Sequence, residues 1–183
     1  HPRIGSMHVL PIKRAKKSIA RIRNFHDNNG GKLLAFIGYK AGMTHIIAKD
    51  NSPNTLYKNQ NISMPVTIIE CPPLRALSIR FYQKSYDGLK LISEAHAKNI
   101  TKEAKKYIKI LKNKGNEPEK FDEIRLAVYT QPYLLGIAKK KPDVLEIGIS
   151  GKDNKEKLEY VKSILDKDIK LGDILKDQKF LDI

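Results

Sequence analysis

The middle of the chain alternates short apolar runs with turn-forming residues. Apolar runs, many of them β-branched or alternating with polar residues, predict strands over residues 33–37, 45–48, 65–70, 77–81, 124–129 and 145–149. The strict alternation of residues 77–81 is typical of a half-buried strand, whereas residues 88–98 fit a strand or a helix. Gly38 and Gly42 predict a tight turn after the first run, and residues 50–54 predict a loop.

Two segments have the periodicity of amphipathic helices. Thr101 is expected to cap a helix that runs to Lys114 and buries Ala104, Tyr107, Ile108 and Leu111. We interpret its opposite face as a solvated surface, formed by Lys102, Lys105, Lys106, Lys109 and Lys112. Asp153 and Glu156 resemble a capping box that opens a second helix, which ends near Leu165 and buries Leu158, Val161 and Leu165.

Short strands with two interposed helices predict an α+β chain that is mainly β, built around a curled antiparallel sheet or a barrel. Residues 1–30 show no apolar periodicity and end in a turn-rich boundary. Residues 179–183 resemble a strand with no closing turn, so we expect this chain to be one part of a longer or split protein.

The composition narrows the class of protein. The 183 residues include 35 Lys and Arg against 20 Asp and Glu, a net charge of +15, which favours a polyanionic partner. The single cysteine, Cys71, excludes an internal disulfide and a Cys-cluster zinc site, and we expect it to be a small buried thiol rather than a nucleophile. The sequence lacks a long apolar run and an apolar signal segment, which predicts an intracellular protein without a membrane span.

The positive charge is concentrated at the N-terminus. Residues 1–25 carry seven basic and no acidic side chains, residues 26–142 carry 20 basic and 10 acidic, and residues 143–183 carry 8 basic and 10 acidic. Four of the seven arginines precede residue 24. Guanidinium groups bind phosphate in a bidentate manner and stack on bases, so the segment reads either as a disordered basic tail or as an arm that orders against nucleic acid.

Catalytic motifs are missing from the sequence. The glycines match neither phosphate-binding loop pattern, and the five histidines form no metal-ligand spacing, so we expect no cofactor, no metal and no small-molecule substrate. Two rival interpretations stay open. The first is an RNA-modifying or nucleic-acid-cleaving enzyme with dispersed catalytic residues, and the second is a basic barrel adaptor that binds a protein partner.

One block of sequence resembles a known family. Residues 33–45, Leu-Leu-Ala-Phe-Ile-Gly-Tyr-Lys-Ala-Gly-Met-Thr-His, look like the signature of the large-subunit ribosomal protein L3 family in its archaeal and eukaryotic form. Further matches follow in family order over residues 2–6, 13–15, 65–70, 72–75, 130–132 and 139–144. Two departures stand out: Phe25 lies where relatives often have tryptophan, and the chain ends before the basic segment and long finger of the family.

The resemblance implies a translation-protein-type β-barrel with an α/β insertion and an extended basic N-terminal arm. We therefore expect an arm over residues 1–30, barrel halves over 31–75 and 124–183 with a helix near 153–165, and an insertion over 76–123. It also implies a cytoplasmic structural constituent of the large ribosomal subunit, not an enzyme, that supports assembly. Its partners would be large-subunit ribosomal RNA and neighbouring ribosomal proteins.

The positive charge and the resemblance to the L3 family together predict which residues bind RNA. In the arm these are Arg3, Lys13, Arg14, Lys16, Lys17, Arg21 and Arg23. Outside it they are Lys40, Thr44, Arg75, Lys139, Lys140 and Lys141. Two interpretations of Gly38 and Gly42 remain open. In the structural one, glycine permits positive φ and close approach, and Met43 packs into the barrel. In the functional one, the glycines let an RNA backbone come near, with Lys40 and Thr44 as phosphate partners.

Overall fold

The computed structural model describes residues 13, 14, 16–20, 22, 25, 33–109, 115, 117–151 and 153–175. Strands dominate, in the order β1 (Tyr39–Lys49), β2 (Asn61–Glu70), β3 (Leu74–Ser85), β4 (Gly88–His96), β5 (Glu123–Tyr129), β6 (Val144–Gly148) and β7 (Asp168–Ile169). The helices are α1 (Lys102–Tyr107), α2 (Asn154–Ile164) and α3 (Leu171–Ile174), with a 3₁₀ turn over Pro132–Leu134. The expected α+β, mainly β class is confirmed.

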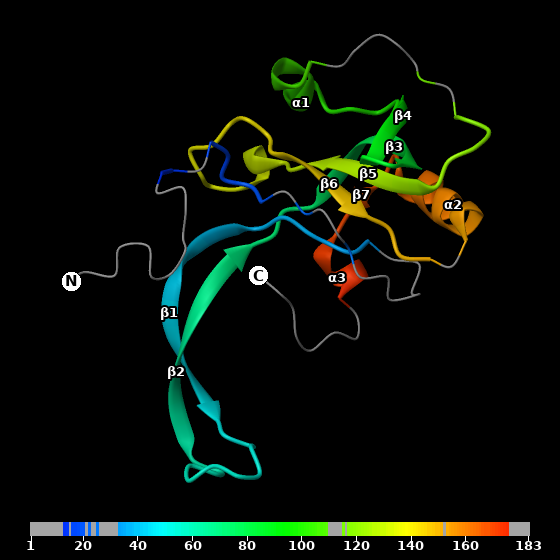
Figure 1. Cartoon of the computed structure of the whole chain (residues 1–183). Helices are drawn as coiled ribbons and strands as arrows, with labels where there is room; N and C mark the ends of the chain where they lie inside the picture. The colour runs from blue at the N-terminus through cyan, green and yellow to red at the C-terminus, as the bar shows by residue number, and fades with distance from the viewer. Residues whose placement is uncertain are drawn as a thin grey trace.

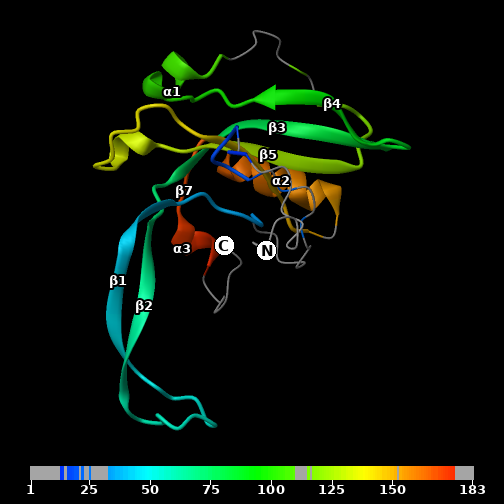
Figure 2. The same cartoon turned by 60° about the vertical axis from the view of Figure 1, so that its left-hand side comes forward.

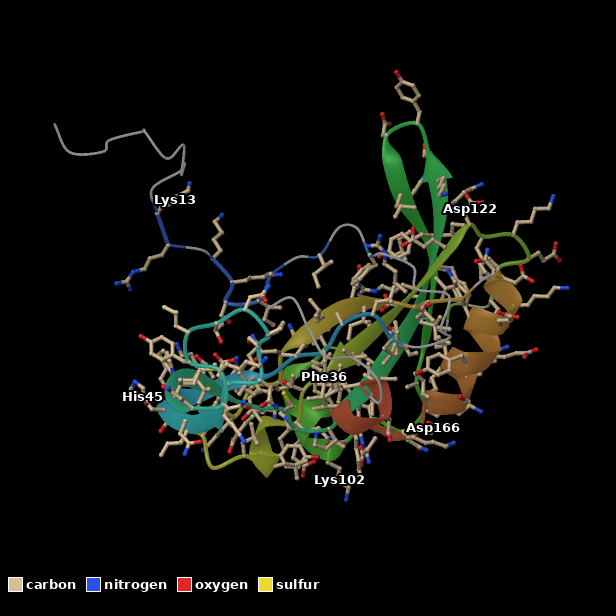
Figure 3. The ribbon with its side chains drawn as sticks, turned by 90° about the horizontal axis from the view of Figure 1, so that it is seen from below. Lys13, Phe36, His45, Lys102, Asp122 and Asp166 are labelled. Carbon is tan, nitrogen blue, oxygen red and sulfur yellow. The ribbon has the colours of Figure 1, made fainter. Side chains whose placement is uncertain are left out.

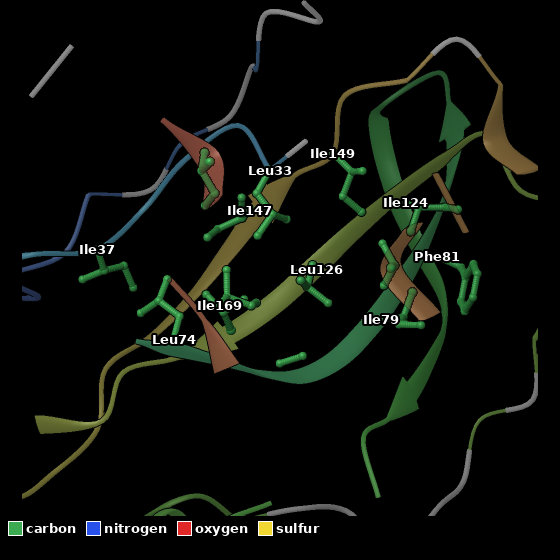
Figure 4. Packing of buried hydrophobic residues seen from close by; sticks show 14 residues of the cluster. Leu33, Ile37, Leu74, Ile79, Phe81, Ile124, Leu126, Ile147, Ile149 and Ile169 are labelled. Carbon is green, nitrogen blue, oxygen red and sulfur yellow. The ribbon is translucent and has the colours of Figure 1, made fainter. Parts of the chain in front are cut away.

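The main sheet has the antiparallel order β4-β3-β5-β6, and β7 pairs with the start of β3. Helices lie on both sides of it: α1 lies above the sheet and α2 below it in Figure 2. One face carries Phe81, Leu126 and Ile147, which are fully or almost fully buried. Figure 4 shows these three side chains within the main apolar cluster. The same cluster includes Val161 of α2 and Ile174 of α3. Burying a side chain such as Leu126 contributes roughly 1.5–3 kcal/mol, so this layer is the stable body of the molecule.

The opposite face of the sheet is covered at one end by α1. Thr101 caps this helix by accepting a hydrogen bond from the Ala104 backbone N–H, as the sequence predicted. Ala104 is buried in a second apolar cluster that includes Leu77 and Tyr129. Because both faces are covered, residues 76–79 are all buried, and the expectation of a half-buried strand there is wrong.

A separate antiparallel ribbon is formed by β1 and β2. Figures 1 and 2 show it extending away from the main sheet, with the loop of residues 50–60 at its far end. Strand register places the apolar side chains of one face opposite one another: Ile46 pairs with Met64, and Ala48 with Ile62. Val66 and Ile68 continue the same face, because successive side chains of a strand alternate. Ile46, Met64 and Ile68 are 44–48 % exposed, so this apolar face is incompletely covered by the described residues.

Several local expectations need correction. Residues 33–37 are buried at Leu33 and Ile37 but form no strand, because the segment pairs through an isolated bridge, Leu33 with Ile149, which follows the end of β6. Residues 38–42 are no tight turn, since β1 already begins at Tyr39 and carries a bulge between Lys40 and Gly42.

Three further expectations also differ from the structure. Met43 is 67 % exposed rather than packed. The first helix ends at Tyr107, before the predicted Lys114, because the backbone becomes extended at Ile108. Asp153 occupies the N-cap of α2 without a side-chain capping bond, so the position was predicted correctly and the capping box was wrong.

The remaining strand predictions are confirmed, and residues 88–96 are a strand. The expected strand over residues 179–183 lies outside the described residues. The predicted division into arm, barrel halves and insertion, and the barrel itself, stay predictions. β3 begins in the first predicted barrel half, extends into the first ten residues of the predicted insertion and pairs with β5, which lies almost entirely in the second half, so these segments share one sheet.

Candidate nucleic-acid interface

The described cations of the arm point into open space. Lys13, Arg14, Lys16 and Lys17 are all exposed, and Figure 3 shows Lys13 set apart from the body of the molecule. No acidic residue occurs within residues 1–25, so these charges have no acidic neighbour along the chain. Arg3, Arg21 and Arg23 lie outside the described residues. The arrangement can neutralise several phosphates of an extended polyanion at once.

The arm returns to the sheet at Phe25. Its ring lies over the guanidinium of Arg125, 5.7 Å from ring centroid to Cζ, and against the backbone of Gly148. The sequence left open whether this aromatic residue packs or stacks, and in the structure it packs on protein. Arg125 was not singled out from the sequence, because a lone arginine in an alternating strand carries no signal of a partner some 100 residues away.

A polar cluster joins the start of β1 to the connection between β5 and β6. The Tyr39 hydroxyl donates to Asp143 Oδ2 at 2.7 Å and lies 2.8 Å from Thr130 Oγ1. Lys139 forms an ion pair with Asp143 and lies 5.5 Å from the centre of the Tyr39 ring. Burial, together with the nearby Asp143 carboxylate, raises the pKa of Tyr39 to about 12, so this hydroxyl stays a donor at physiological pH.

The predicted RNA-binding residues outside the arm differ in whether they are paired with a carboxylate. Lys140 and Lys141 are exposed, whereas Lys139 is held by Asp143. Arg75 forms an ion pair with Asp168, with Nε 2.6 Å from Oδ1. That hydrogen bond lowers the pKa of the Asp168 carboxyl, so the pair stays charged. Among the described residues, Lys140 and Lys141 thus have no ion pair, whereas the Arg75 guanidinium and the Lys139 ammonium are each paired with a carboxylate.

On the ribbon, Lys40 and Thr44 are both exposed. Thr44 pairs with Val66 and so lies on the apolar face, whereas His45 and Lys49 lie on the opposite one. Positive φ is found at Gly88 and Gly151 and not at Gly38 or Gly42, so the turn reading of those two glycines is wrong. A β-carbon on Gly38 would lie 2.4 Å from Ile69 Cγ2 and 2.9 Å from Cys71 Sγ, so glycine there permits close approach of protein.

The described residues contain no group of three His, Cys, Asp or Glu placed to hold a metal ion. Within the same part of the chain, no helix is both long and apolar enough to cross a membrane. Cys71 is half-buried, and burial raises the pKa of its thiol, which disfavours the reactive thiolate.

Comparison with known proteins gives a consistent result. Residues 1–120 match the family model described as Ribosomal protein L3. The chain is 36 % identical over 190 residues to the large ribosomal subunit protein uL3 of Methanobrevibacter smithii, covering 99 % of this chain and 56 % of that protein. It is 39 % identical over 187 residues to uL3 of Picrophilus torridus, covering 100 % and 57 %. For uL3 of Methanopyrus kandleri the identity is 38 % over 194 residues, covering 100 % and 54 %. The chain thus spans about half the length of these curated relatives.

Proposed function

The chain belongs to the ribosomal protein L3 family, and from this premise we propose that it is a structural constituent of the large ribosomal subunit that binds large-subunit ribosomal RNA and supports subunit assembly. Its role would be architectural rather than catalytic, and its location the cytoplasmic ribosome. The relatives it matches are named as large ribosomal subunit proteins, which supports this assignment.

The observation that carries the proposal is the acid-free arm with its four exposed, described cations at residues 13, 14, 16 and 17. Each phosphate that such a side chain neutralises releases condensed counterions, which drives binding and makes it steeply dependent on salt. The main sheet, with its two buried apolar clusters, supplies the folded body from which the arm extends.

We assign secondary contacts to Lys40, Lys140 and Lys141, which are exposed and have no ion pair recorded among the described residues. Lys139 and Arg75 already pair with carboxylates, so their contribution to RNA binding should be smaller. Thr44 stays a predicted phosphate partner, although its place beside Val66 suits an apolar environment better.

Sedimentation tests the proposal directly. Tagged chain, expressed in cells, should travel with the large ribosomal subunit through a gradient at moderate salt and leave it after ribonuclease treatment. Recovery of the chain at the top of the gradient before nuclease would overturn the assignment. Turnover of ribosomal RNA by the pure chain would favour the enzyme alternative instead.

The ribbon favours a second, additional contact with protein. Its apolar face, formed by Ile46, Ala48, Ile62, Met64, Val66 and Ile68, carries no charge. An isolated two-stranded ribbon is marginally stable in water, and an uncharged apolar face gains stability against other apolar groups rather than against phosphate. We infer that neighbouring ribosomal protein covers this face.

Adjacent isoleucines allow a matched test of that contact. Ile46 lies on the apolar face, whereas Ile47 lies on the opposite face and is 80 % exposed. Ile46→Asp should reduce co-sedimentation with the large subunit, and Ile47→Asp should leave it unchanged. Equal effects of the two substitutions would count against a contact specific to one face.

A further inference from the structure

A second feature of the arm is the contact that Phe25 makes with the main sheet. The Phe25 ring touches two neighbouring strands of the main sheet, since Arg125 of β5 and Gly148 of β6 are register partners. We call Phe25, Arg125, Gly148 and Tyr82 the Phe25 clasp. Apart from Phe25, its members lie within the sheet, more than 50 residues away along the chain.

Arg125 is held in a defined position within the clasp. Its guanidinium Cζ lies 5.4 Å from the centre of the Tyr82 ring and 5.7 Å from that of Phe25, both within the range of a cation–π contact. Its Nε donates to Glu123 Oε1 at 2.7 Å, and its side chain is 10 % exposed. A cation fixed in this way presents a preformed surface on which the Phe25 ring can lie.

Gly148 completes the seat for the ring. A β-carbon built on Gly148 would lie 2.6 Å from both Cγ and Cδ2 of Phe25, far inside van der Waals contact. Glycine is therefore required here by the ring itself, and any larger residue would push Phe25 off the sheet. Backbone and cation thus contact the same aromatic residue from two strands.

We propose that Phe25 is a positioning residue for RNA binding, which tethers the basic arm to the sheet and thereby confines its cations near the RNA surface. The inference rests on the proposed function. It assigns Phe25 a contact with protein rather than with a base, and it makes Arg125 a support for the arm rather than an RNA ligand.

The size of the effect follows from the length of the tether. The centre of the described cations, near residue 15, is about ten residues from Phe25 and about eighteen from Leu33, the first described residue after Phe25, which forms a bridge with Ile149. The volume that a flexible tether explores grows roughly as the 3/2 power of its length. Loss of the clasp would lower the effective concentration of the arm cations at the RNA surface about two- to threefold, so the affinity for RNA should fall by about that factor or more.

Two variants displace the clasp in different ways. Phe25→Ala removes the ring, whereas Gly148→Ala keeps the ring and occupies its seat. Gly172→Ala is the matched glycine control, because a β-carbon at Gly172 meets nothing within 4 Å. The probe is large-subunit ribosomal RNA of Methanobrevibacter smithii transcribed in vitro, and its affinity for each full-length variant is measured over a series of salt concentrations.

Phe25→Ala and Gly148→Ala should each weaken binding at least about two- to threefold. The slope of log affinity against log salt should stay at the wild-type value, because no cation has been removed. The double variant should be no weaker than either single one, Phe25→Tyr should retain wild-type affinity, and Gly172→Ala should be neutral.

A loss of affinity with Phe25→Ala alone would mean that the ring stacks on RNA, and it would overturn the inference. A changed salt slope, or no change with either variant, would also overturn it. Should Gly148→Ala unfold the sheet, Arg125→Met takes its place, because it removes the cation under the Phe25 ring and leaves the ring itself intact. A loss of affinity like that of Phe25→Ala supports the tether, and wild-type affinity overturns it. If the unmodified chain shows no salt-dependent binding to this RNA, the proposed function fails, which is a separate outcome.

Discussion

Two glycines of one sequence block should respond very differently to the same substitution. A β-carbon at Gly38 would lie 2.4 Å from Ile69 Cγ2 and 2.9 Å from Cys71 Sγ, whereas a β-carbon at Gly42 would meet nothing within 4 Å. The Ile69 methyl belongs to a β-branched side chain with few alternative rotamers, so the contact cannot be relieved by a simple rotation. Gly38→Ala must therefore separate the segment before β1 from the end of β2.

Overpacking of this kind typically costs about 1–3 kcal/mol, while an exposed substitution with free space stays within about 0.5 kcal/mol. For a chain of this size, 1 kcal/mol corresponds to a shift of roughly 2–4 °C in Tm. Gly38→Ala should thus lower Tm by roughly 2–12 °C in thermal unfolding followed by circular dichroism, and Gly42→Ala should leave it nearly unchanged. Equal Tm values for the two variants would refute the close-approach explanation of Gly38.

Two further predictions concern titration and surface charge. Because the folded pKa of Tyr39 is raised to about 12 from an ordinary value near 10, its stabilising contribution is complete below pH 10 and is lost as the pH rises through 10 to 12. Tyr39→Phe should therefore have a lower free energy of unfolding than the wild type at neutral pH. Between pH 10 and 12 its free energy of unfolding should fall less steeply than that of the wild type, as measured by urea unfolding at each pH. The same pH dependence in both proteins would contradict the role given to this hydroxyl. Lys105→Ala with Lys109→Ala should weaken RNA binding less than Lys13→Ala with Arg14→Ala, because we interpret the lysines in and just after α1 as a solvated surface. The reverse ranking in a filter-binding assay would make these lysines part of the interface.

Local patterning was enough to predict most of the strands and the caps. Residues 66–69 are all β-branched, and two prolines follow at positions 72 and 73; β2 does end just before them, at Glu70. Thr101 caps α1 through the expected hydrogen bond, because a capping side chain bonds to a backbone N–H only three residues further along the chain. Such features depend on interactions within a few residues, so they can be predicted from the local sequence.

Features that depend on distant partners could not be predicted. Leu77 is buried because Ala97, Ile100 and Ala104 pack against it on the second face, which no alternation within β3 reveals. Gly38 and Gly42 look alike along the chain, yet one approaches β2 closely and the other accompanies a bulge. At the candidate interface, the distribution of charge along the sequence was enough to locate the arm. The contact of Phe25 with Arg125 and Gly148 could not be predicted, because it depends on the register of β5 against β6.

The central claim is that the arm cations bind ribosomal RNA through its phosphates. Its most direct test replaces Lys13, Arg14, Lys16 and Lys17 by glutamine, leaving Phe25 in place, and measures binding to large-subunit ribosomal RNA over a series of salt concentrations. Each lost phosphate contact should flatten the slope of log affinity against log salt by about 0.7–0.9, so the slope should become shallower by up to about 3–3.6 in the quadruple variant. An unchanged slope would show that these cations do not contact the RNA backbone and would contradict the account.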